Sequence, residues 1–167
     1  MGTTFAGLSG FQWAILGAAI AVIGGGIGSS MGITYIANVA AGILTEDPSK
    51  FGALLPIIAV PGTQGVYGFI TGVLVMTVMK PGGGWGVLEG FQGFYIFLAC
   101  LPVAFNCMIS AIYQGLTSVG AAGMVAKRTE EAGKALILPA LVETYAVLSL
   151  ITTIIMLVVA VRPTISG

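Results

Sequence analysis

Charged residues are scarce in this sequence. Its 167 residues include six basic and six acidic side chains, so 7% are charged while 57% are hydrophobic. Soluble domains usually carry about 25% charged residues. So few charges cannot cover a surface that faces water, and we expect lipid to be the main solvent of the chain. The net charge is zero, and without a basic patch we expect no nucleic-acid partner.

Histidine is absent and cysteine is rare, with two residues. The missing imidazole removes the commonest metal ligand and general base. Cys100 and Cys107 are seven residues apart in one apolar run, so on a helix they are too distant to bridge each other. We interpret both as small buried apolar side chains.

Nucleotide-binding motifs are missing as well. The glycine-rich segment 24–32 is not followed by the Lys-Ser/Thr pair of a phosphate-binding loop. We therefore expect a protein that is not an enzyme by itself.

Long apolar runs dominate what is present. Each exceeds the ~20 residues that span the hydrocarbon of a bilayer as a helix, and a backbone in lipid must satisfy its own hydrogen bonds. The sequence predicts an all-α membrane protein with four transmembrane helices. The runs are Phe11–Leu44, Phe51–Met79, Gly90–Ala126 and Ala135–Val161.

Two halves of the chain repeat each other. The segment Ala40–Leu44 and the charged loop after it resemble Ala121–Val125 and its own charged loop. We predict two tandem hairpins in the same orientation: residues 1–79, a linker at 80–89 outside the cytoplasm, and residues 90–167. Parallel repeats that cannot bury their faces alone tend to close into rings or arrays, so we expect an oligomeric ring.

A second similarity between the halves concerns proline and tyrosine. Pro61 precedes Tyr67 by six residues, and Pro139 precedes Tyr145 by six. This alignment places Gly65 opposite Glu143. It predicts that one hairpin has kept an acidic residue which the other lacks.

Basic residues predict the orientation in the membrane. Four of the six lie in the polar loops 45–50 and 127–134, while Lys80 and Arg162 lie at the opposite ends of the helices. Cytoplasmic loops are enriched in Lys and Arg. We expect a cell-membrane protein with both polar loops in the cytoplasm and both termini outside.

Glu143 is the strongest functional signal in the sequence. It lies nine residues after Lys134 and nineteen before Arg162, about 14 Å into the membrane at 1.5 Å per residue. An acidic residue in mid-helix costs about 2.5–3.5 kcal/mol on insertion scales, and such residues mark ion or proton sites.

The second helix carries a polar stripe. Val60, Thr63, Gln64 and Tyr67 follow the i, i+3, i+4, i+7 spacing of one helix face. Pro61 lacks an N–H, so it frees the carbonyl of Ile57 and loosens the helix beside this stripe.

The third helix adds a second stripe of Ser110, Gln114 and Thr117. Gln64 and Gln114 reach a depth similar to that of Glu143. Glutamines in membranes also serve as interhelical hydrogen-bonding groups. Together with one carboxylate, however, they predict an oxygen cage that suits a hard monovalent cation, since a proton alone needs fewer oxygens.

Small residues recur in the first helix. Gly24, Gly28 and Gly32 are four apart, a pattern that lets helices approach closely. We interpret this helix as part of an inner wall of tightly packed helices.

The sequence resembles a known family at four places. They are the glycine-rich first helix, the segment 55–69 with Val-Pro-Gly-Thr-Gln-Gly-Val-Tyr-Gly-Phe, Leu-Pro-Val-Ala-Phe at 101–105, and Val-Glu-Thr-Tyr-Ala at 142–146. Together they resemble the proteolipid, or rotor-ring, subunit of V-type ATPases, in its sodium-pumping bacterial and archaeal form.

The resemblance implies specific roles. Glu143 would be the essential carboxylate, and Thr63, Gln64 and Gln114 the side-chain ligands of Na⁺. Val60, where the family more often has Leu, would contribute its backbone carbonyl, and Tyr67 would hydrogen-bond the carboxylate.

The family also implies an assembly. A homo-oligomeric ring in lipid turns against a stator membrane subunit and meets a central-stalk subunit, while other subunits hydrolyse ATP. A proton-carrying ring of the same kind is the main alternative. An ion channel or secondary transporter fits less well, because the repeats are parallel.

Overall fold

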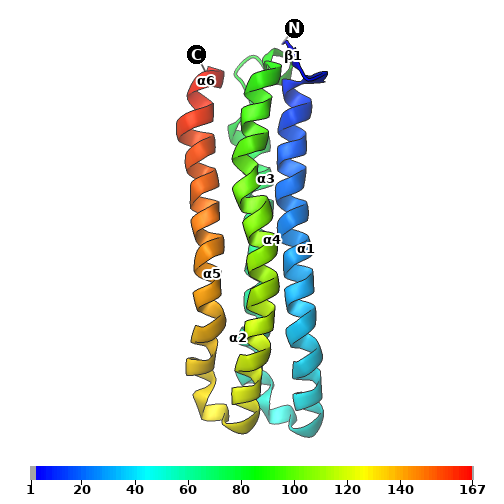
Figure 1. The fold of residues 1–167 in the computed structure, drawn as a ribbon, viewed down its shortest axis with the longest axis vertical. Helices are drawn as coiled ribbons and strands as arrows, with labels where there is room; N and C mark the ends of the chain where they lie inside the picture. The colour runs from blue at the N-terminus through cyan, green and yellow to red at the C-terminus, as the bar shows by residue number, and fades with distance from the viewer. Residues whose placement is uncertain (1–2, 167) are drawn as a thin grey trace.

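The computed structural model describes residues 3–166 as a bundle of four long helical segments that run side by side (Figure 1). Within these residues, four segments of 31 to 38 residues are long and apolar enough to cross a membrane. The predicted all-α fold with four transmembrane helices is confirmed, and the chain is a multi-pass membrane protein.

The first and third segments are single helices, α1 (Gly10–Glu46) and α4 (Gly90–Lys127). The second segment is composite: α2 (Phe51–Ala59), a 3-10 turn η2 (Val60–Gly62) and α3 (Thr63–Val78). The fourth segment is composite too, with α5 (Ala132–Ile155), a π-helical stretch η5 (Met156–Val161) and α6 (Arg162–Ser166). A 3-10 turn η3 (Trp85–Val87) lies between α3 and α4.

A short β-hairpin precedes α1, with β1 (Thr4–Phe5) antiparallel to β2 (Leu8–Ser9). The Trp13 indole N–H donates to the Phe5 carbonyl at 3.0 Å and ties the hairpin to α1. The sequence did not predict these strands, because two residues are too few for an alternating pattern. Both ends of the chain lie at the same end of the bundle (Figure 1).

The two polar loops are tighter than predicted. Helix α1 continues through Glu46, α4 continues through Lys127, and α5 begins at Ala132, so α-helices include part of each polar segment. Asp47 and Arg128 have extended backbones, with φ of −143° and −144°, and a single 3-10 turn follows each: η1 (Pro48–Lys50) and η4 (Thr129–Glu131). The first loop contacts the last turn of α4, because the Lys50 ammonium donates to the Ala126 carbonyl at 2.6 Å.

The backbone sets the register of the repeat. Asp47 and Arg128 are the extended residues of their loops, so they correspond to each other in the repeat. The difference between their residue numbers equals the difference between Phe51, where α2 starts, and Ala132, where α5 starts. We call this difference the repeat offset. It places Gly62 opposite Glu143, so the predicted alignment with Gly65 is wrong. The error has a simple cause: matching Pro61 with Pro139 shifts the alignment by three residues, because the two prolines occupy different turns.

Glycines of α1 bring it against α4. An added Cβ on Gly24, Gly28 or Gly32 would collide with α4 backbone, at Ala104, Met108 and Ala111 respectively. The close helix packing that the glycine spacing predicted is thus present, and it joins two helices of the same chain. That these two helices form the inner wall of a ring stays a prediction.

Candidate functional site

Glu143 lies on α5, well inside the fourth segment, and the residue is half-buried. The Tyr67 hydroxyl, from α3, donates to Glu143 Oε1 at 2.7 Å. Lys134 and Arg162 are nine and nineteen residues away on the same segment, which is about 13 Å or more of helical rise. The carboxylate is thus held by a neutral donor, away from those two cations.

Two fully buried glutamines lie beside it. The Gln64 amide Nε2 donates to Gln114 Oε1 at 2.6 Å, and Gln114 Nε2 donates to the Pro139 carbonyl at 2.9 Å. Buried amides without partners are costly, so this chain of bonds fixes both side chains. It also links α3, α4 and α5.

The 3-10 turn η2 presents a carbonyl next to these amides. Pro61 has no N–H to continue the α-helical ladder, and here the helix tightens over Val60–Gly62. The Val60 carbonyl accepts from both the N–H and the hydroxyl of Thr63, the latter at 3.0 Å. The same hydroxyl lies 3.3 Å from Gln64 Oε1.

These contacts bring the predicted residues together. Gln64 and Tyr67 are one turn apart on α3, and their contacts reach Pro139 and Glu143, one turn apart on α5. Thr117 does not join them, because its hydroxyl donates to the Tyr113 carbonyl of its own helix at 2.9 Å.

Two serines lie near the site: Ser110 belongs to the stripe that the sequence predicted, whereas Ser29 escaped the sequence reasoning. Ser29 Oγ accepts the Gly65 N–H at 2.8 Å, and Ser110 Oγ donates to the Val142 carbonyl at 3.1 Å. Each joins one of the two long single helices, α1 or α4, to a composite segment beside the site. The repeat offset relates Ser29 to Ser110, and this equivalence with a residue of the predicted stripe is the signal that could have found Ser29.

The chemistry of this site is that of oxygen ligands around one acidic group. Hydroxyl, amide and carbonyl oxygens lie on the helical turns next to one carboxylate, a donor set that hard cations prefer. Residues 3–166 contain no cluster of three or more His, Cys, Asp or Glu side chains that could hold a metal ion. Such an arrangement can bind one monovalent cation, or a proton, without leaving a net charge in the membrane.

Comparison with known proteins gives two matches along the chain to the family model of the ATP synthase C subunit, at residues 16–75 and 97–156. The V-type sodium ATPase subunit K of Enterococcus hirae is 37% identical over 148 residues, which are 88% of this chain and 91% of that protein. The A-type ATP synthase subunit K of Methanocaldococcus jannaschii is 36% identical over 148 residues, 86% of this chain and 60% of that protein.

The starts of the two family matches are related by the same repeat offset that the loops give. The matches cover well over half of the chain and fall on both hairpins, and the names of the relatives agree with the family that the motifs suggested. The resemblance drawn from the sequence is confirmed: the chain belongs to the family of the ATP synthase C subunit.

Proposed function

We propose that this chain is a rotor-ring subunit that binds Na⁺ at Glu143 and carries it across the cell membrane. The observation that carries the proposal is the half-buried carboxylate bonded by Tyr67 beside the buried pair of Gln64 and Gln114. The name of the Enterococcus hirae relative, a V-type sodium ATPase subunit, supports sodium as the ion.

The proposed ligands are the Glu143 carboxylate, the side-chain oxygens of Thr63, Gln64 and Gln114, and the Val60 carbonyl. Tyr67 positions the carboxylate by its hydrogen bond. With Na⁺ bound, the site has no net charge and can face lipid. Without it, the charged carboxylate needs water or a fixed cation nearby, so release is confined to places that supply one.

Transport against a membrane potential needs energy from elsewhere. Moving one charge against 100 mV takes about 2.3 kcal/mol, and the sequence has no nucleotide motif. The proposed assembly is a homo-oligomeric ring that turns against a stator membrane subunit and carries a central stalk, driven by subunits that hydrolyse ATP. The polar loops would face the cytoplasm and the stalk, with the segment 80–89 on the far side.

A proton-carrying ring is the alternative that the same carboxylate allows. The oxygens favour sodium, because a proton needs the carboxylate and one or two partners, whereas a cation needs a full set of ligands. Potassium should bind less well, since a cage that fits the smaller ion must widen to admit it.

Carbodiimide labelling of Glu143 tests the proposal. The reagent attacks protonated carboxyl groups, so we expect labelling to slow as the pH rises. Millimolar Na⁺ should slow it further, because the bound ion excludes the proton, and K⁺ should protect less. Glu143→Gln should abolish both labelling and transport. Labelling that follows pH but ignores Na⁺ at every pH would establish a proton carrier instead.

A further inference from the structure

Two side chains of α4 bond the backbone of α5 on both sides of Glu143. The Ser110 hydroxyl donates to the Val142 carbonyl at 3.1 Å, and the Asn106 amide Nδ2 donates to the Tyr145 carbonyl at 2.6 Å. Val142 directly precedes Glu143, and Tyr145 lies two residues after it. Donors from a neighbouring helix thus hold the one turn of α5 that carries the carboxylate.

Helix α5 needs such support because Pro139 lies inside it, one turn before Glu143. Proline has no N–H, so the Ala135 carbonyl lacks its usual helical donor and the helix is weakened at this turn. The hydrogen bonds of α5 alone therefore set the direction of the next turn less firmly. The bonds from α4 to the carbonyls of Pro139, Val142 and Tyr145 supply this constraint.

The first hairpin has no side chain at the place equivalent to Asn106. The repeat offset relates Asn106 to Gly25 and Tyr145 to Gln64, and an added Cβ on Gly25 would collide with the Gln64 carbonyl. Helices α1 and α3 thus touch directly at this point. In the second hairpin, Asn106 spans a wider gap and bonds the carbonyl at the equivalent position.

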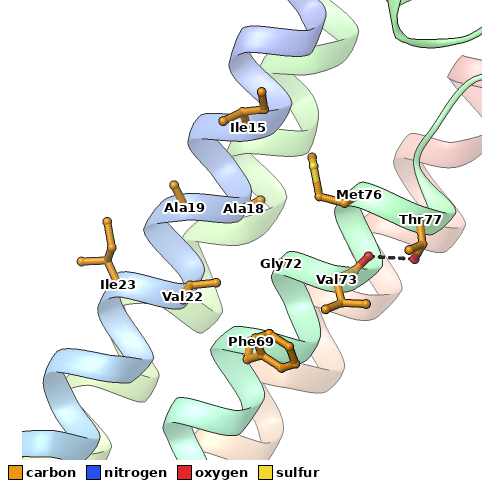
Figure 2. A pocket seen from close by; sticks show the side chains of 10 residues that line it. All are labelled: Ile15, Ala18, Ala19, Val22, Ile23, Phe69, Gly72, Val73, Met76 and Thr77. Atoms are coloured by element: carbon orange, nitrogen blue, oxygen red, sulfur yellow. Dashed lines mark hydrogen bonds between the residues drawn. The ribbon is translucent and has the colours of Figure 1, made fainter.

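Farther along the first hairpin, the contact between α1 and α3 is apolar. Figure 2 shows a groove there, of about 560 Å³, with Ile15 and Val22 on α1 and Phe69 and Val73 on α3. The hydrogen bond drawn in it runs from the Thr77 hydroxyl to the Val73 carbonyl at 2.7 Å, within α3. Among residues 3–166, side chains donate to carbonyls across a hairpin only in the hairpin that carries the carboxylate.

We infer that Asn106 and Ser110 are positioning residues of the cation site, which favour Na⁺ over the proton by fixing the rotation of α5. The inference rests on the function proposed above. A side-chain group lies about 5–6 Å from its helix axis, so a rotation of about 10° moves it by about 1 Å. A cation held by several oxygens at once does not tolerate such a shift, whereas a proton is bound by one oxygen and moves with it.

Carbodiimide labelling of Glu143 in the assembled protein measures both ions. Asn106→Leu keeps the size of the side chain and removes the donor. The Na⁺ concentration that gives half protection should rise about 10–100-fold, the usual effect of losing a residue that orients a metal ligand. The pH dependence of labelling without Na⁺ should stay unchanged. Ser110→Ala should act in the same direction, and Asn106→Gln, which keeps the amide, should recover part of the protection.

Cys107→Ala is the matched control. The Cys107 thiol, also on α4, lies 3.8 Å from the Ser149 hydroxyl of α5, so its removal loosens the contact between the helices without touching the carbonyls beside Glu143. We expect a lower melting temperature by circular dichroism and unchanged Na⁺ protection.

Two results would overturn the inference while the proposed function stands. One is an equal loss of Na⁺ protection in Asn106→Leu and Cys107→Ala, which would reduce Asn106 to a packing role. The other is a shifted pH dependence in Asn106→Leu, since the proton should not depend on the rotation of α5. Absence of Na⁺ protection in the unmodified protein is a different result, and it would overturn the proposed function together with the inference.

Discussion

At the scale of single residues, the site is organised by hydrogen bonds from neutral donors. Gln64 and Gln114 bond each other and the Pro139 carbonyl, and Tyr67 bonds Glu143. None of these donors is charged, so none competes with a cation by repulsion. The carboxylate therefore remains the one group of the site whose charge an ion can balance.

Replacing Gln114 with Ala should weaken sodium binding without removing the carboxylate. The change leaves the buried Gln64 amide and the Pro139 carbonyl without their partner, at a cost of about 1–3 kcal/mol. Carbodiimide labelling should keep its pH dependence, while protection should need more Na⁺. Thr117→Ala on the same helix is the control, because its hydroxyl bonds only its own turn. Equal protection in both variants would exclude Gln114 as a ligand.

The sequence predicted these side chains from their spacing and depth, since helical periodicity places Thr63, Gln64 and Tyr67 on one face. It could not predict the bond from Gln114 to the Pro139 carbonyl. Every residue carries a carbonyl, and only the packing of α4 on α5 decides which one is reached. Thr117 shares the predicted stripe with Gln114, but its hydroxyl bonds a carbonyl of its own helix and does not reach the site.

At the scale of helices, the close approach of α1 to α4 depends on glycine. Gly28 meets the backbone of Met108, whereas Gly26, two residues away, faces open space. The sequence indicated a tightly packed helix here. It could not say whether the partner was another subunit or another helix of the same chain, because small-residue spacing carries no information about the partner.

Gly28→Leu should therefore destabilise the subunit itself. A side chain there must push α4 away, at or above the upper end of the about 1–3 kcal/mol typical of overpacking. We expect a lower melting temperature by circular dichroism in detergent. Gly26→Leu should leave the melting temperature nearly unchanged. Similar melting of both variants, with loss of the ring only in the first, would show that Gly28 matters between chains and not within one.

The loop at Asp47 predicts a local response to acid. Its carboxylate accepts from the Ser49 hydroxyl at 2.6 Å and from the Ser49 N–H at 3.1 Å, and these bonds hold its pKa below the ordinary 3.8. A lowered pKa stabilises the loop above pH 3.8, and this stabilisation is lost as the pH falls through the folded value. Hydrogen exchange at Ser49 should speed up there, beyond the intrinsic pH effect. In Asp47→Asn this extra step should be absent; its persistence would refute the role of the carboxylate.

At the scale of the whole molecule, two hairpins of one design stand in the same orientation. The four apolar runs sufficed to predict this architecture, because a backbone in lipid has few alternatives to the helix. The register between the hairpins required the structure, since the prolines misaligned them by three residues. Both polar loops lie at the end of the bundle opposite the termini (Figure 1).

The basic loops predict which end faces the cytoplasm. A cysteine in place of the exposed Ser49 should react with an impermeant thiol reagent only from the cytoplasmic side. A cysteine in place of Gly82, exposed at the opposite end with open space around it, should react only from outside. The reverse pattern would invert the proposed topology and move the stalk to the other end.

Gly62 occupies the position in the first hairpin that Glu143 occupies in the second, and this affects how many ions each revolution moves. A ring built from such chains offers one carboxylate for every two hairpins, so each revolution moves half as many ions as a ring of the same girth with a carboxylate on every hairpin. For a fixed input of work per revolution, each ion can then be driven against about twice the potential. The absence of one acidic side chain would thus lower the number of ions moved per revolution and raise the ion gradient that the same work can sustain.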